Sequence, residues 1–162
     1  ASEIYCWKFF GVVVTQLLLV NWGQININFL TIKSIFKMSA LQLEQLVEKY
    51  FAAVDNKDLS TVLSFLTPDA TFTIATYQST FKGRDTEISE MFERLFARYD
   101  KILHSNFDHF PSGPNKISSR FEVQNSKIGS PTIYKNNCNF FKLQGNYFHE
   151  VYVYMSGDNA LA

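Results

Sequence analysis

Cysteine is scarce in this chain of 162 residues: the two cysteines, Cys6 and Cys138, lie far apart in the sequence. No C-x-x-C spacing occurs, so the sequence contains neither a disulfide framework nor a cysteine-based metal site. Histidine is also rare, with three residues, and it forms no recognisable metal-ligand cluster. We therefore expect no metal and no cofactor.

An excess of charge of one sign is also missing. Lys plus Arg and Asp plus Glu are equal at 15 each, and no run of like charge occurs. Proteins that bind nucleic acid usually carry a basic patch, so we expect no nucleic-acid partner. The N-x-[ST] glycosylation signal is absent too, which favours a cytoplasmic protein.

Aromatic residues, in contrast, are abundant. The chain has 16 Phe and 8 Tyr, and its hydrophobic content of 46% is enough for one globular domain with a core. Rings of this size either line an apolar cavity or fill a core. Composition alone does not separate these two interpretations.

Residues 1–37 differ in character from the rest, because no charge occurs between residues 9 and 32. A membrane helix and a signal peptide are two possible interpretations, but asparagines interrupt the apolar run and no suitable cleavage site follows it. A third interpretation is favoured by Met38-Ser39-Ala40, which resembles a natural start before an amphipathic helix. We expect residues 1–37 to be an N-terminal extension outside the functional fold, residues 38–162 to form one domain, and no membrane partner.

Three helices are predicted by apolar residues spaced three and four positions apart. The first ends at Asp55, and Asp58 is a good N-cap for the second. Thr67-Pro68-Asp69 ends the second helix because proline cannot continue it. A loop through Lys82-Gly83-Arg84 precedes the third. The apolar positions are Leu43, Leu46, Val47, Tyr50, Phe51 and Val54; Leu59, Val62, Leu63 and Leu66; and Ile88, Met91, Phe92, Leu95, Phe96 and Tyr99.

Strands are predicted where the apolar period changes to two, which happens after residue 101. A short strand, Thr71–Ile74, precedes the third helix, and the others are expected at residues 102–110, 117–123, 134–143 and 147–155. Helices followed by antiparallel strands are typical of an α+β fold. We expect three N-terminal helices packed on a strongly curved, mostly antiparallel sheet. Three short helices cover such a sheet incompletely, and the uncovered part becomes a pocket.

The segment 38–162 resembles the SnoaL-like, nuclear transport factor 2-like superfamily. The resemblance rests on four stretches in order: V-E-K-Y-F-A-A-V-D-N-K-D-L at 47–59, L-T-P-D-A-T-F at 66–72, F-K-G-R-D at 81–85 and H-E-V-Y-V-Y-M-S-G-D-N at 149–159. It implies a cone-shaped cavity and frequent dimerisation through the sheet. Members include ketosteroid isomerase, scytalone dehydratase and polyketide cyclases, as well as binding modules without chemistry, so the fold indicates where the site lies and not which reaction occurs.

Two residues fall at positions that are catalytic in ketosteroid isomerase. Tyr50 lies on the apolar face of the first helix, so its hydroxyl needs a partner inside the protein. The resemblance implies that this tyrosine donates a hydrogen bond to a developing oxyanion, and the structural alternative is a core tyrosine. Ile74 falls where the isomerase has its general-base aspartate. Because Ile74 cannot take a proton, this position argues against ketosteroid isomerase chemistry.

A second catalytic candidate comes from the resemblance to scytalone dehydratase, which implies a catalytic His104 held by Asp55 at the end of the first helix. Such a pair would fix the imidazole tautomer and support proton abstraction. The sequence departs from the dehydratase at Val123–Gln124, near which its second histidine would fall, and at Val54. A hydrogen-bonded strand histidine and a helix-end aspartate are the structural alternatives.

Five further residues are predicted to contact a ligand. Asn139 falls near the hydrogen-bond-donating acid of the isomerase, and it shares a strand face with Phe141. Phe92 and Ile74 are the other apolar candidates, and Asn106 is predicted to lie on the same face as His104, with His109 on the solvent side. We therefore expect a homodimeric protein with a pocket for a small molecule. It is either a cofactor-free lyase or isomerase for a hydroxylated or polyketide-like substrate, or a non-catalytic ligand-binding or dimerisation module.

Overall fold

The computed structural model describes residues 38–161, and the expectation for residues 1–37 therefore concerns a part of the chain outside this range. Three α-helices are present in this range, α2 (Ala40–Asp55), α3 (Leu59–Ser64) and α4 (Ser89–Arg98), together with a 3₁₀ helix, η1 (Ala75–Tyr77), and a π-helical turn, η2 (Gly83–Ile88). Six strands accompany them: β1 (Leu66–Ile74), β2 (Ser79–Lys82), β3 (Lys101–Pro111), β4 (Lys116–Ser126), β5 (Ile133–Gln144) and β6 (Tyr147–Met155). None of the described helices combines the length and the apolar character needed to cross a membrane.

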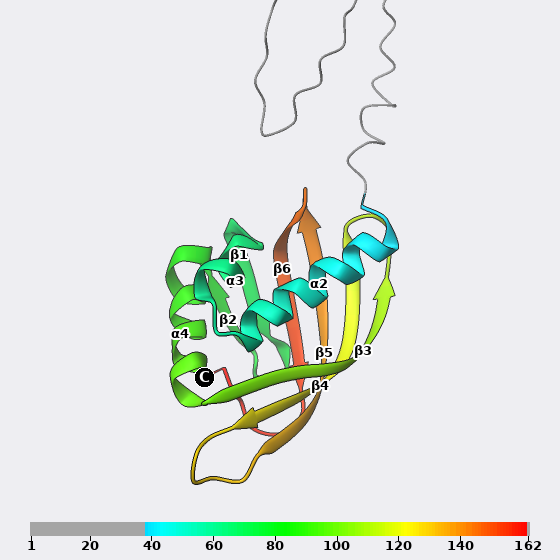
Figure 1. Cartoon of the computed structure of the whole chain (residues 1–162). Helices are drawn as coiled ribbons and strands as arrows, with labels where there is room; N and C mark the ends of the chain where they lie inside the picture. Colours follow the sequence, from blue (N-terminus) through cyan, green and yellow to red (C-terminus); the bar gives the residue numbers. More distant parts are fainter. Residues whose placement is uncertain (1–37, 162) are drawn as a thin grey trace, which may run out of the picture.

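The six strands form one sheet in the order β2-β1-β6-β5-β4-β3. Strands β1 and β6 run parallel, and all other neighbours run antiparallel. The helices lie along one face of this curved sheet, and the end of the described chain returns to the lower end of α4 (Figure 1). The prediction of an α+β fold with helices on a mostly antiparallel sheet is confirmed.

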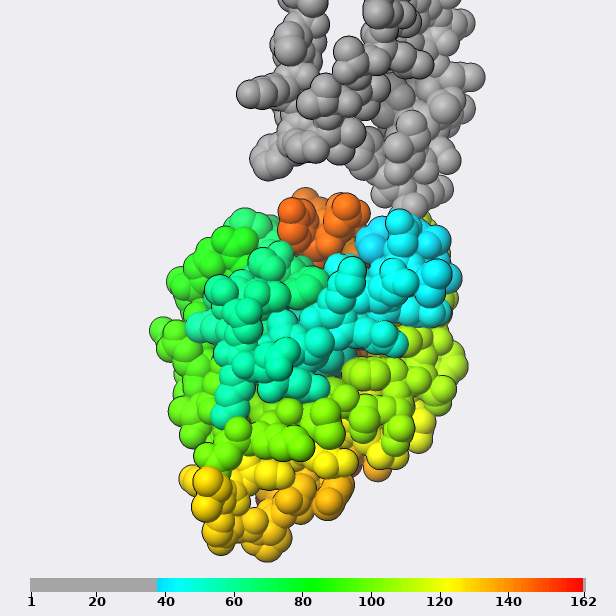
Figure 2. All heavy atoms as spheres, in the orientation of Figure 1, coloured from blue at the N-terminus to red at the C-terminus, as the bar shows by residue number. Residues whose placement is uncertain are grey.

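Helix α2 covers the concave side of the sheet because its sequence fixes both its start and its buried face. The Ser39 side chain accepts a hydrogen bond from the Gln42 main-chain N–H, and the Gln42 side chain accepts one from the Ser39 N–H, a capping box. Leu43, Val47 and Tyr50 then recur at helical spacing and are at most 1% exposed. In the space-filling view α2 and β3 close this face of the molecule together (Figure 2).

The predicted boundaries differ from the observed ones in two places. Strand β1 begins at Leu66, where Leu66 pairs with Phe148 of β6, and so takes in Thr67-Pro68-Asp69, which was expected to end a helix. Strand β2 was expected to be a loop. It pairs with the end of β1, from Thr71 opposite Lys82 to Ile74 opposite Ser79.

Candidate functional site

A cavity lies between α2, α4 and the concave face of the sheet. Its walls are mostly apolar and include Phe51, Phe72, Phe92 and Phe121, and Leu161 from the end of the described chain closes part of it. The cavity volume is about 50 Å³. That is room for roughly three or four water molecules.

The most ordered polar feature of the cavity is the contact between His104 on β3 and Asp55 at the end of α2. The Asp55 carboxylate accepts two hydrogen bonds from His104: Oδ2 lies 2.9 Å from the main-chain nitrogen and Oδ1 lies 2.5 Å from ring Nδ1. His104 lines the cavity, whereas Asp55 stands behind it and contacts the cavity only through the imidazole. The two predicted partners are therefore brought together.

This contact also defines the tautomer of the histidine. A carboxylate only accepts hydrogen bonds, so the Nδ1 of His104 must carry a proton, and in the neutral ring Nε2 then has a free lone pair. The rings of Phe51 and Phe121, whose centroids lie 4.4 Å and 5.4 Å from that of His104, restrict how the imidazole can turn. An oriented ring with a free lone pair at a cavity wall is suited to accept a proton.

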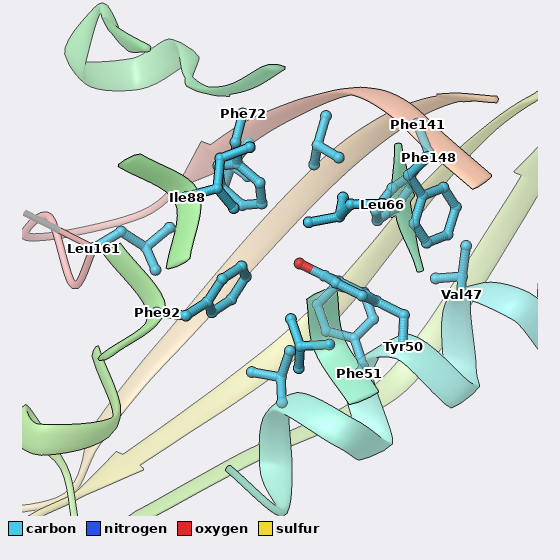
Figure 3. Close-up of a cluster of buried hydrophobic side chains, with 14 of the residues drawn as sticks. Val47, Tyr50, Phe51, Leu66, Phe72, Ile88, Phe92, Phe141, Phe148 and Leu161 are labelled. Carbon is cyan, nitrogen blue, oxygen red and sulfur yellow. The ribbon is translucent and has the colours of Figure 1, made fainter. Parts of the chain in front are cut away.

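Tyr50 brings a second polar group to the same cavity. Five aromatic rings, those of Phe51, Phe65, Phe92, Phe141 and Phe148, surround its ring at centroid distances between 5.1 and 6.5 Å. Its hydroxyl points away from α2 into the space between Phe92 and Leu66 (Figure 3). No residue of the described segment hydrogen-bonds to this hydroxyl. Burial raises the pKa of Tyr50, so the group stays a neutral donor at physiological pH.

Three asparagines complete the polar lining: Asn125 on β4, and Asn137 and Asn139 on β5. Asn125 and Asn139 are 2% and 3% exposed. The Oδ1 atoms of all three are buried, and none of them receives a hydrogen bond within residues 38–161. Only Asn139 was predicted for the site. Because residues two apart on a strand share a face, the placement of Asn139 could have identified Asn137 as well.

Lys135 lies on the same face of β5 and also lines the cavity, although it was not predicted for the site. It is 4% exposed, and its ammonium group donates a hydrogen bond to the main-chain oxygen of Asp158. Burial lowers the pKa of Lys135, and the nearby Asp158 carboxylate partly opposes that shift. The ammonium group is therefore already hydrogen-bonded within the protein.

The other predicted ligand contacts divide into three outcomes. Phe92 lines the cavity as expected. Ile74 and Phe141 are buried at 0% and 2% exposure, but they belong to the core beside the cavity and not to its wall. Asn106 does not line the cavity: this side chain is exposed and its amide donates to the Glu122 carboxylate at 3.0 Å.

A β-bulge explains the position of Asn106. Ser105 pairs with Glu122 and Asp108 pairs with Arg120, so β3 contains one residue more than β4 between these pairs. Asn106 has a φ of 54° there, and asparagine is one of the few non-glycine residues that tolerate this conformation. The extra residue reverses the alternation, so that side chains after the bulge change faces.

His109 consequently points inward, contrary to the prediction that it faces solvent. Its side chain is 9% exposed, and Nδ1 lies 2.8 Å from the Ser119 hydroxyl. The ring stacks on Phe107 with an interplanar angle of 8°, and Glu48 Oε1 lies 3.4 Å from Nε2 without an aligned hydrogen bond. His109 is not among the residues that line the cavity.

Residues 38–161 contain no cluster of three His, Cys, Asp or Glu side chains that could hold a metal ion. The polar groups on the cavity wall are instead one oriented histidine, one neutral phenol, three amides and the Lys135 ammonium group, which is bonded to Asp158. The histidine can accept a proton, and the phenol and amides can hold a polar ligand.

Comparison with known proteins identifies the family of this chain and solved structures that share its fold. A family model described as a SnoaL-like domain matches residues 47–143, more than half of the chain. No curated protein is significantly similar to this sequence. Many solved structures share the fold, at sequence identities that inform on the fold alone.

Three of these structures illustrate the similarity. A protein from Shewanella putrefaciens, proposed to be a SnoaL-like polyketide cyclase, is 16% identical, with 84% of this chain and 92% of that chain covered and a TM-score of 0.63. A protein from Novosphingobium aromaticivorans, proposed to be an aromatic ring hydroxylase, is 22% identical, with coverage of 74% and 90% and a TM-score of 0.61. A hypothetical protein from Catenulispora acidiphila with a ketosteroid isomerase-like fold, solved in complex with trimethylamine, is 15% identical, with coverage of 67% and 83% and a TM-score of 0.61.

Proposed function

This chain belongs to the SnoaL-like domain family, and on that premise we propose that its cavity binds a small carbonyl compound and that His104 moves a proton of that compound. The reaction class is that of a cofactor-free isomerase or lyase. The observation that supports it is that the Asp55-bound His104 and the unpaired hydroxyl of Tyr50 line one cavity.

The proton transfer follows from the roles of the two groups. The Nε2 lone pair of His104 takes a proton from the carbon next to the carbonyl, and the electrons of that C–H bond move into an enolate. Tyr50 donates a hydrogen bond to the enolate oxygen, and Asp55 stabilises the imidazolium through Nδ1–H. In a substrate with a double bond next to the α-carbon the enolate is conjugated, and return of the proton to the far carbon of that double bond completes an isomerisation. Return of the proton to a β-hydroxyl, which leaves as water, completes an elimination.

The size of the cavity narrows the substrate. A polycyclic polyketide does not fit in a space for roughly three or four waters. We therefore favour, of the two expected substrate types, the small hydroxylated compound.

Deuterium exchange at the α-carbon tests the proposal without knowledge of the natural substrate. The protein is incubated in D₂O with pentan-3-one or with 1,3-dihydroxyacetone, and loss of the α-proton signals is followed by NMR. We expect exchange above the buffer rate for the wild type and a loss of most of this excess in His104→Gln. His149→Gln is the matched control, because His149 contacts Thr67 and Asp69 away from the cavity. Equal exchange in wild type and His104→Gln would refute the proposal.

A non-catalytic binding module is the second candidate, and one observation favours it. Among the described residues of the cavity wall, His104 is the single histidine and no carboxylate is present. A reaction that needs a separate acid and base would therefore rely on His104 for both roles. Saturation-transfer NMR combined with the exchange assay distinguishes the two candidates, because a binding module binds a ketone without exchanging its α-protons.

We propose further that a second copy of the chain covers the outer face of the sheet. Phe140 and Tyr152 are directly paired across β5 and β6, they point away from the cavity, and they are 47% and 40% exposed. Tyr154 continues the row at 50% exposure, with its ring centroid 5.7 Å from that of Phe140. Light scattering coupled to size exclusion should detect a dimer that Tyr152→Glu weakens, and a monomeric wild type would contradict this proposal.

A further inference from the structure

Three amide side chains on one wall of the cavity lack the hydrogen bonds that buried amides normally have. Asn137 and Asn139 lie two residues apart on β5, and Asn125 lies on the neighbouring strand β4. Within residues 38–161, their buried Oδ1 atoms meet no donor, and no hydrogen bond from their NH₂ groups is found. Buried polar groups in proteins are nearly always paired, so this cluster requires an explanation.

The energetic cost argues against a role in folding. Each buried polar group without a partner destabilises a protein by about 1–3 kcal/mol. A leucine of similar size at these positions would avoid that cost and would match the apolar wall around it. Polar side chains near this cluster are already hydrogen-bonded to other groups. Ser119, directly opposite Asn139 on β4, is paired with His109. The ammonium group of Lys135 is directed to the Asp158 carbonyl.

The chemistry of the missing partner follows from the chemistry of an amide. Each amide has a carbonyl oxygen that accepts and an NH₂ group that donates, and a hydroxyl group complements both because it donates and accepts. We propose that Asn125, Asn137 and Asn139 form a polar subsite that binds the hydroxyl groups of a small hydroxylated carbonyl compound. This proposal rests on the proposed function of the cavity and specifies its ligand.

The dimensions agree with such a ligand. Two residues along a strand span about 7 Å, so hydroxyls at the two ends of a three-carbon ligand can each reach an amide. The remaining walls are mostly apolar, both aromatic and aliphatic, and fit the carbon chain, while Tyr50 and His104 are left for the carbonyl and its α-proton. The subsite would thus hold the substrate by its hydroxyls and leave the reacting atoms near the histidine.

A pair of isosteric ketones tests the proposal with all three amides intact. Dihydroxyacetone and pentan-3-one both have six non-hydrogen atoms and differ only in that two hydroxyls replace two methyl groups. Their dissociation constants are measured by saturation-transfer NMR in His104→Gln, so that turnover does not disturb the measurement. We expect tighter binding of dihydroxyacetone, although hydrophobicity alone would favour pentan-3-one. Equal binding, or a preference for pentan-3-one, overturns the proposal.

Leucine variants then assign the preference to the amides. In Asn139→Leu and Asn125→Leu, made in the same His104→Gln background, we expect the preference for dihydroxyacetone to fall roughly five-fold, the equivalent of about 1 kcal/mol for one neutral hydrogen bond. The melting temperature should stay unchanged or rise, because an unpaired buried group is removed. Asn136→Leu is the control, since Asn136 lies on the same strand with an exposed side chain. Lower melting temperatures with an unchanged preference would mean that the amides are structural, and would overturn the proposal.

The two proposals fail in different ways. If neither ketone undergoes α-exchange but dihydroxyacetone binds preferentially and through the amides, then the catalytic proposal is wrong and the polar subsite stands. If pentan-3-one exchanges as fast as dihydroxyacetone, with no difference in binding, then His104 acts as proposed and the polar subsite is wrong.

Discussion

Replacing Asp55 with asparagine should abolish most of the proton transfer while leaving the fold intact. The substitution keeps the shape of the side chain, and one oxygen remains to accept the hydrogen bond from the His104 main-chain nitrogen. The other end becomes an NH₂ group, which faces Nδ1 and can only donate to it. The imidazole proton must then move to Nε2, which removes the lone pair that the proposed mechanism uses.

The size of both effects follows from this contact. A general base contributes roughly 100- to 10,000-fold to a rate, so the rate of α-exchange in Asp55→Asn should fall by that factor, which corresponds to a rise of about 3–5 kcal/mol in activation free energy. The loss of stability should be smaller. Two charge-assisted hydrogen bonds are replaced by neutral ones, a net loss of about 2 kcal/mol in the free energy of unfolding.

Three measurements on the same variant test this reasoning. The exchange assay gives the rate, urea unfolding gives the stability, and ¹⁵N NMR of the His104 ring shows which nitrogen carries the proton. Asp69→Asn is the matched control, because Asp69 lies 3.5 Å from Nδ1 of His149 in a pair outside the cavity. A folded Asp55→Asn with its ring proton on Nε2 and an undiminished exchange rate would refute His104 as the base.

Three further predictions follow from burial and backbone geometry. Burial raises the pKa of Tyr50, so above about pH 10 the hydroxyl loses its proton in the unfolded chain before it does so in the folded one. The free energy of unfolding should therefore fall with rising pH in the wild type and not in Tyr50→Phe. Parallel curves of stability against pH for the two proteins would contradict this. Burial lowers the pKa of Lys135, so this residue should make the wild type more stable as the pH rises towards about 10.5, the ordinary pKa of lysine. In Lys135→Met, urea titrations should show that this increase of the free energy of unfolding with pH is lost. At the bulge, Asn106→Gly should keep full exchange activity and stability, whereas Asn106→Val should lose about 1–2 kcal/mol by urea unfolding because a β-branched residue resists positive φ; loss of exchange in Asn106→Gly would return this residue to the site.

The helices were predictable because their signals are local. Each of the first two begins at a side chain that caps it, Ser39 and Asp58, and each repeats its apolar residues at helical spacing. Strand β2 was missed for the opposite reason. It has four residues, alternates only between exposed and half-buried positions, and owes its conformation to pairing with β1. Such pairing is set by the tertiary structure and leaves little trace in so short a segment.

The candidate site was predictable only as far as its side chains lie on regular elements. Tyr50 and Asp55 follow from the helical period, and His104 and Asn139 follow from strands whose alternation is unbroken up to those positions. The hydrogen-bond partners of the amides that line the cavity could not be predicted in this way. Whether a side chain such as Asn125 is satisfied depends on neighbours from three strands, which a period along one strand does not reveal.

The bulge in β3 had one signal in the sequence, in the residue Asp108. An unbroken strand would place Asp108 on the same face as His104 and would bury a carboxylate towards the core. Burial of an unpaired charge is so costly that the alternation must reverse between these two residues, and Asn106 is the residue there that best tolerates a positive φ. The reversal leaves Asp108 exposed, with its carboxylate 3.1 Å from Arg120, and turns Phe107 and His109 inward. The charge pattern of a strand can therefore locate a bulge that its apolar pattern conceals, and with it decide which histidine reaches the cavity.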